Sequence, residues 1–170
     1  MVNEGRIYLL WPKGYILKDP RRHEKAKPWN QWTLNELLLC FDQPLPALRA
    51  DAQNELVGRG PRHWDALVQA MDQAEPESAQ ETWILWTLGR IGENHPKRNA
   101  FFADQWQKGI NRRLQTLRIV AHQARVTKES VLPPFVGSGL MEEEARLRHA
   151  AVLAIHQASD VNWKSLLLEL

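Results

Sequence analysis

Two histidines on one predicted helix are the residues whose type and spacing come nearest to a metal site. His149 and His156 are seven residues apart, which puts them two turns apart on nearly the same helical face. At about 1.5 Å per residue this spacing corresponds to roughly 10.5 Å, too far for both imidazoles to reach one ion. We therefore predict no metal ligands and no bound cofactor, and we interpret the pair as solvent-facing or inter-repeat polar residues.

Two further segments carry residue types that could do catalysis, but in the wrong pattern. Residues 137–139 read Gly-Ser-Gly, without the lysine of a phosphate-binding loop and without the spacing of a G-x-S-x-G nucleophile. Residues 142–144 are three adjacent glutamates, which we interpret as the negatively charged first turn of a helix. Paired-carboxylate catalysis would need two carboxylates in different environments. The sequence predicts no catalytic residues and no enzymatic activity of this chain.

A basic segment near the N-terminus, followed by tryptophans, is the candidate for nucleic-acid binding. Its possible basic patch consists of Arg21, Arg22, Lys25 and Lys27. Residues 1–30 carry seven Lys or Arg against three acids, whereas the rest of the chain carries fifteen against seventeen. Because a nucleic-acid-binding helical repeat would need basic residues along its helices, this balance argues against a nucleic-acid partner. We interpret the patch as a solvated linker.

Composition excludes several other classes of site. No apolar run approaches the roughly 20 residues of a membrane span, and residues 1–10 lack the pattern of a secretory signal. Cys40 is the single cysteine, so a disulfide within the chain, a cysteine-based zinc site and a c-type haem attachment are excluded. It lies in an apolar run and is interpreted as a small buried hydrophobe. The cellular compartment stays undetermined.

The elements that would position these residues fall into two parts. Residues 1–31 form a predicted extended segment, with one strand at residues 5–11 and a proline-containing linker at residues 12–31. A lone strand needs a partner sheet, which this chain does not obviously contain. Residues 32–170 form a predicted helical domain. It begins with Thr33 and Glu36, the pattern of a capping box.

The helical domain shows a short helix, a turn and an amphipathic helix that recur. The predicted helices cover residues 34–41, 47–57, 64–74, 78–91, 99–107, 110–123, about 142–158 and 162–170, with a stop at Gly58 and Gly60. Aligning the longer helices places Arg49, Glu81, Arg113 and Arg148 in register, at intervals of 32, 32 and 35 residues. Three residues further on lie Ala52, Ile84, Thr116 and Ala151, and seven further on lie Leu56, Leu88, Val120 and Ile155. These periods predict an all-α fold, an α-solenoid of about four stacked helical hairpins.

The residues of the longer helices resemble a known repeat family. Residues 147–155, Leu-Arg-His-Ala-Ala-Val-Leu-Ala-Ile, resemble the second helix of a HEAT repeat, and residues 48–56 are a looser copy. Glu81 departs from the usual basic residue, and Thr116 departs from the usual small alanine. The resemblance implies a helical-repeat scaffold that binds a protein or a neighbouring domain of the same polypeptide.

A narrower resemblance concerns residues 5–14, Gly-Arg-Ile-Tyr-Leu-Leu-Trp-Pro-Lys-Gly, followed by a linker and a helix. This order is similar to the junction in large bacterial proteins where a sugar-dehydrogenase-like β-propeller precedes a HEAT solenoid, often with a c-type haem domain. The resemblance implies that the chain is a structural segment of a larger, periplasmic or extracellular dehydrogenase. A complete protein of this sequence would instead be cytoplasmic. Neither the propeller active site nor the haem motif is present here.

Residues 126–139 interrupt the helical pattern and account for the longer interval of 35 residues. A possible contact loop within them consists of Leu132, Pro133, Pro134, Phe135 and Val136. Exposed apolar residues on a loop held by a rigid scaffold would form a contact site. An irregular first helix of the fourth hairpin is the equal alternative.

Three functions follow, in order. The first is a non-catalytic scaffold that mediates protein–protein or interdomain contacts, because solenoids present long surfaces. The second is the structural segment of a propeller-type dehydrogenase. The third is a DNA-binding HEAT-like protein.

Overall fold

The computed structural model describes residues 28–127 and 132–158. Within these ranges the chain forms eight α-helices and no strand, which confirms the all-α class for this part of the protein. The predicted strand at residues 5–11, the possible basic patch at residues 21–27 and the predicted helix at residues 162–170 lie outside the described residues.

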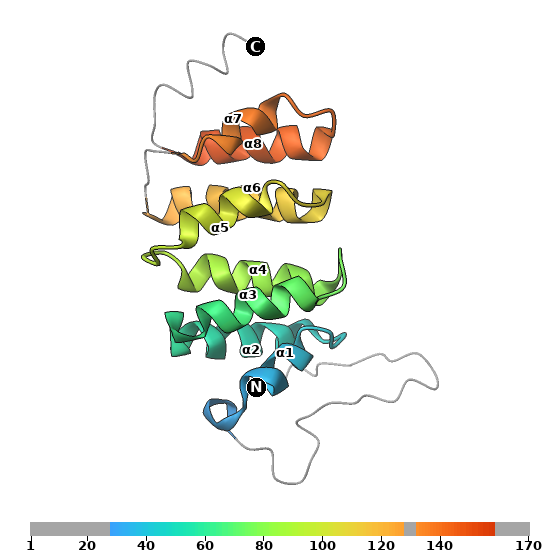
Figure 1. Cartoon of the computed structure of the whole chain (residues 1–170), viewed down its shortest axis with the longest axis vertical. Coiled ribbons are helices and arrows are strands. Elements are labelled where there is room, and N and C mark those ends of the chain that lie inside the picture. The colour runs from blue at the N-terminus through green and yellow to red at the C-terminus, as the bar shows by residue number, and fades with distance from the viewer. Residues whose placement is uncertain (1–27, 128–131, 159–170) are drawn as a thin grey trace, which may run out of the picture.

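Consecutive helices pair into four hairpins. The helices are α1 (Leu34–Cys40), α2 (Pro46–Arg59), α3 (Trp64–Gln73), α4 (Ala79–Ile91), α5 (Arg98–Gln105), α6 (Ile110–Thr127), α7 (Phe135–Leu140) and α8 (Ala145–Gln157), with short 3₁₀ turns η2 (Trp29–Gln31) and η3 (Pro61–His63). The second helices of successive hairpins contact one another, α2 with α4, α4 with α6 and α6 with α8. Figure 1 shows the hairpins following one another in chain order along the long axis.

The helix ends follow from local chemistry. The Thr33 backbone N–H donates to a Glu36 carboxylate oxygen at 2.6 Å, and the Glu36 N–H donates to the Thr33 hydroxyl at 3.3 Å, so the predicted capping box is confirmed. Helix α2 runs through Gly58 and ends before Gly60, whose φ of +74° lies in the region that favours glycine. The predicted stop at Gly58 is therefore wrong, and the one at Gly60 is confirmed.

The glutamates at residues 142–144 precede α8 and do not form its first turn, so that prediction is wrong. Glu144 is the N-cap residue, and its carboxylate accepts from the Arg146 backbone N–H at 3.3 Å. The Arg146 side chain also donates to this carboxylate, which holds the pKa of Glu144 below its ordinary value. Arg148 donates to the carbonyls of Glu142 and Glu143 at 2.7 and 2.8 Å, and these bonds fix the turn outside the helix.

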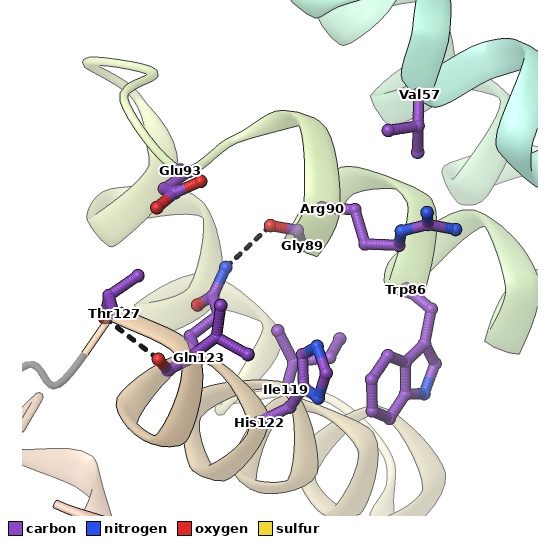
Figure 2. Close-up of a pocket in the computed structure, with 10 residues that line it drawn as sticks. Val57, Trp86, Gly89, Arg90, Glu93, Ile119, His122, Gln123 and Thr127 are labelled. Carbon is purple, nitrogen blue, oxygen red and sulfur yellow. Dashed lines mark hydrogen bonds between the residues drawn. The ribbon is translucent and has the colours of Figure 1, made fainter.

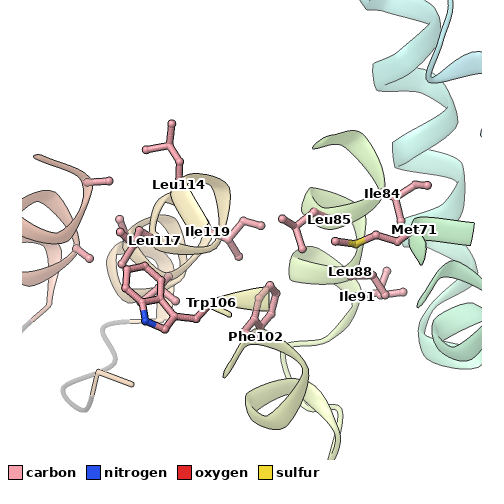
Figure 3. Close-up of a cluster of buried hydrophobic side chains, with 14 of the residues drawn as sticks. Met71, Ile84, Leu85, Leu88, Ile91, Phe102, Trp106, Leu114, Leu117 and Ile119 are labelled. Carbon is pink, nitrogen blue, oxygen red and sulfur yellow. The ribbon is translucent and has the colours of Figure 1, made fainter. Parts of the chain in front are cut away.

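The register read from the sequence describes the core. The four residues at each aligned apolar position are buried: Ala52, Ile84, Thr116 and Ala151, then Leu56, Leu88, Val120 and Ile155. Figure 3 shows side chains of α4, among them Leu85 and Leu88, on one side of this core and those of α6, among them Leu117 and Ile119, on the other. The apolar core is therefore continuous from hairpin to hairpin.

The possible contact loop is mostly buried, and its last two residues begin a helix. Leu132, Phe135 and Val136 are buried, Pro133 is half-buried and only Pro134 is exposed. Phe135 and Val136 begin α7, and the Phe135 ring stacks on Trp106 with the centroids 5.6 Å apart. An exposed contact site at Leu132, Phe135 and Val136 is thus wrong, and the alternative of an irregular first helix is confirmed. These apolar side chains fill the fourth hairpin.

Candidate binding face on the second helices

The second helices of the last three hairpins expose a surface whose charge differs from that of the chain as a whole. Helix α6 contains four arginines and no carboxylate, and α8 contains two arginines, two histidines and no carboxylate. The slightly acidic balance of the helical part as a whole, which argues against a nucleic-acid partner, therefore does not describe α6 and α8. The acids that balance them lie largely elsewhere, among them Asp42, Glu75, Glu77 and the glutamates at residues 142–144 in the turns within hairpins.

A pocket of about 170 Å³ lies on this surface between α4 and α6. Its floor is formed by Gly89 and Ile119, and a Cβ added at Gly89 would lie 2.7 Å from Ile119 Cγ2. Glycine thus lets α4 and α6 approach closely here. The Gln123 side chain donates to the Gly89 carbonyl at 2.6 Å and fixes the contact (Figure 2).

An indole and an imidazole form the wall of this pocket. Trp86 of α4 is half-buried, and its Nε1–H donates to the Gln115 side-chain oxygen at 3.0 Å. Figure 2 shows the Trp86 and His122 rings side by side, and their centroids are 5.9 Å apart in an edge-to-face arrangement. The hydrogen bond holds the indole in this orientation.

The same two rings also line a second, more open hollow of about 410 Å³ between α6 and α8. Its other lining residues include Arg118, Arg125 and Leu153. Trp86 and His122 therefore lie on the ridge between two neighbouring hollows. We call the surface formed by both hollows the second-helix face.

The positive charges on this face are not neutralised. Arg118 and Arg125 are exposed, and within residues 28–127 and 132–158 neither forms an ion pair or a side-chain hydrogen bond. Arg90 donates to the side-chain oxygens of Gln53 and Asn54 at 2.8 and 2.9 Å, and both acceptors are uncharged amides. Among the described residues that line the two hollows, Glu93 is the one carboxylate.

Apolar side chains lie beside these charges. Val126, Val152 and Leu153 are exposed to 62%, 42% and 39%, and they belong to α6 and α8. Val126 lines the first hollow and Leu153 lines the second, so each hollow has an exposed aliphatic side chain. The second-helix face therefore combines uncompensated cations, an oriented aromatic wall and aliphatic contacts.

A second polar site, around Glu81, has a different character. Glu81 is 2% exposed, and its carboxylate accepts from the Glu77 N–H, the Asn111 amide and Arg112 Nε at 2.9, 2.9 and 2.6 Å. Arg112 also donates to the Gln105 side chain and to the Met71 carbonyl. Because these groups satisfy one another, we interpret the site as a structural joint between the second and third hairpins.

The residues singled out from the sequence do not line the two hollows, or they lie outside the described ranges. His149 and His156 are exposed on α8, and the part of the chain that the structure describes contains no cluster of metal-ligating residues. Cys40 is buried, as expected. The possible basic patch Arg21, Arg22, Lys25 and Lys27 is not described.

The tryptophans that follow that patch have a structural role. The Trp29 and Trp32 rings pack with their centroids 4.7 Å apart, and both backbone carbonyls accept from Arg59 at 3.0 and 2.7 Å. Trp32 is buried. Trp32 is therefore not available to stack on a base.

The residues of the second-helix face were missed because net charge was counted over the whole helical part. A count helix by helix would have found the signal, since residues 110–127 contain four arginines and no acid.

No described helix is long and apolar enough to cross a membrane. Comparison with protein-family models, with curated proteins and with solved structures found no match.

Proposed function

We propose that this chain is a HEAT-like α-solenoid that acts as a non-catalytic binding module for a protein or for a neighbouring domain of the same polypeptide. The stacking of the hairpins in chain order supports the solenoid, because each hairpin then contacts its neighbours in the chain. The burial of aligned positions supports repeats that share one helical pattern.

The observation that carries the binding function is the second-helix face. Two adjoining hollows share Trp86 and His122 on their common ridge. The aliphatic Leu153 of α8 lines the second hollow. Binding sites are concave and largely apolar, with a few polar groups that fix orientation. Tryptophan and arginine are also the residues that contribute most to protein–protein binding.

DNA or RNA binding is the second candidate, and it is favoured by Arg118 and Arg125, which have no ion pair among the described residues. A nucleic-acid partner would use these cations, but it would leave the exposed Val126 and Leu153 without an apolar contact. A peptide chain would use both kinds of side chain. The propeller-linked alternative rests on residues 5–14, which lie outside the described part of the chain.

A peptide-display selection on the immobilised full chain tests the proposed function. Enriched peptides are then measured against two leucine variants, Leu153→Ser on the second-helix face and Leu39→Ser on α1, where Leu39 is 63% exposed. We expect Leu153→Ser to weaken binding severalfold and Leu39→Ser to leave it unchanged. Equal binding to both variants, or no enriched peptide, would contradict the proposal.

A further inference from the structure

We infer that the second-helix face binds an acidic peptide segment, with carboxylates on Arg118 and Arg125 and an aliphatic side chain between Trp86 and Leu153. This inference rests on the proposed function and adds the chemical class of the partner. Four residues of one hollow supply the required groups, two cations and two apolar walls.

Charge complementarity is the first argument. Arg118 and Arg125 have no partner in the described ranges, so a carboxylate that binds them replaces no existing ion pair. Guanidinium groups match carboxylates in a two-pronged geometry. The nearby carboxylate-free α8 adds no repulsion on the other side of the hollow. An approaching acidic segment is therefore attracted to the part of α6 that carries Arg118 and Arg125.

The spacing of the two arginines limits the spacing of the acids. Seven residues along α6 correspond to about 10.5 Å at 1.5 Å per residue. Two carboxylates on one face of a segment match this distance when they are three residues apart in a polyproline II chain, at about 9 Å, or seven apart in a helix. Adjacent acids would be too close together to reach both arginines. The inference thus specifies separated acids and not a simple acidic run.

The apolar groups favour a peptide over a nucleic acid. Leu153 and the Trp86 ring border the same hollow as the two arginines. Val126 is exposed to 62% beside them on α6. An aliphatic side chain placed between two acids would cover this apolar surface, whereas a phosphate backbone carries no such group.

The chain's own acidic turn is a poor occupant of the face. Within residues 142–144, Glu142 pairs with Arg113 and Glu144 pairs with Arg146 at 2.9 Å. A second copy that docked Glu142 and Glu144 would first have to break both ion pairs. The acidic segment is therefore expected to belong to another protein or another domain.

Fluorescence anisotropy with the full chain tests this inference. The probe is a labelled peptide of about twelve residues, long enough at roughly 3.1 Å per residue in a polyproline II conformation to cross the face, with acids three residues apart and leucines between them. Three comparison probes accompany it: the same peptide with amides in place of the acids, the same peptide with serines in place of the leucines, and a single-stranded DNA. We expect the intact peptide to bind at least about tenfold more tightly than any of the three.

Matched double variants locate the binding. Arg118→Glu with Arg125→Glu reverses the two unpaired cations, and we expect binding to weaken at least about tenfold. Arg62→Glu with Lys108→Glu makes the same change of net charge at two exposed sites away from the face, and we expect less than about a twofold effect. All four residues are exposed, so both variants should fold, and circular dichroism checks this.

The possible outcomes separate this inference from the proposed function. Equal weakening by both double variants, or equal binding of the amide peptide, overturns the acidic partner and leaves a binding face for another peptide. Tighter binding of single-stranded DNA overturns it in favour of a nucleic acid. Self-association that the acidic peptide does not reverse, seen by sedimentation, overturns it in favour of a second copy. If none of the peptides binds, the inference of an acidic partner is wrong. The proposed binding function is contradicted only if the display selection gives no enriched peptide or if Leu153→Ser does not weaken binding.

Discussion

Two adjacent arginines on α6 join the third hairpin to its two neighbours in different ways. Arg112 reaches back to Glu81 in the second hairpin, and this pair is almost buried, with side-chain exposures of 13% and 2%. Arg113 reaches forward to Glu142 in the fourth hairpin, and that pair is more open, at 20% and 27%. Neighbouring residues of a helix point about 100° apart, so one helix can serve both joints.

The difference shows that these hairpins are held together by different forces. At the first joint, hydrogen bonds satisfy the Glu81 carboxylate and link α3, α4, α5 and α6. At the second joint, Arg113 lies over the Trp106 ring at 4.5 Å, and its buried Nε has no hydrogen-bond partner among the described residues. Apolar packing across this joint is close, since a Cβ at Gly139 would lie 3.4 Å from Leu117 Cδ1 and 3.5 Å from the Trp106 ring of the third hairpin.

The largest effect is expected from Arg112→Met. It would leave the Glu81 carboxylate buried without its cation, and breaking a buried pair in this way costs about 3–5 kcal/mol. Urea unfolding followed by circular dichroism measures the loss. Arg118→Met, at an exposed arginine without a partner among the described residues, is the control and should change stability little. A loss below about 1 kcal/mol for Arg112→Met would show that the joint is held by packing after all.

This joint also shows what the sequence could and could not predict. The sequence alone shows that Glu81 departs from the repeat pattern, because aligning the longer helices places it where the other three have an arginine. Its compensation by Arg112 lies on the next hairpin, 31 residues away, and periodicity cannot reveal which side chain meets it. The register itself predicted buried positions correctly because burial follows from the helical period alone.

The first helix of the fourth hairpin is an element that the sequence pattern did not predict. Helix α7 has six residues, two of them glycine, and two prolines precede it, so local propensity argues against a helix. It forms because Phe135 stacks on Trp106 and because Gly139 packs close to Ala151. Trp106 belongs to the third hairpin and Ala151 to α8, so both contacts are made with residues outside the segment. The sequence pattern of the segment alone therefore could not decide between a loop and a helix.

Overpacking the contact between α7 and α8, within the fourth hairpin, should have the next largest effect. Ala151 is fully buried against α7, so Ala151→Leu must push the helices apart, at a cost of about 1–3 kcal/mol. The neighbouring Val152→Leu adds a methylene at a site that is 42% exposed and should leave the unfolding midpoint unchanged. If both variants unfold at the same urea concentration, α7 does not pack on α8 as described.

Removing the cation of the second joint should cost less than removing that of the first. Arg113→Met loses the open pair with Glu142 and the contact with Trp106, but it also removes a buried Nε that has no hydrogen-bond partner in the described ranges. We expect a loss of about 1 kcal/mol, measured in the same urea series as Arg112→Met. A loss equal to that of Arg112→Met would remove the distinction between the two joints.

The smallest effect is expected at Thr116, on the same helix, and it should be a gain. Thr116 is fully buried, and its hydroxyl has no hydrogen-bond partner among the described residues, so Thr116→Val keeps the shape and removes an unsatisfied group. We expect about 0.5–1 kcal/mol of added stability, seen as a higher melting temperature. Thr87 is the matched control, because it is equally buried but donates to the Trp83 carbonyl at 2.7 Å. Thr87→Val should therefore lower the melting temperature, and a rise in both variants would mean that hydroxyl burial, and not the missing partner, determines the sign.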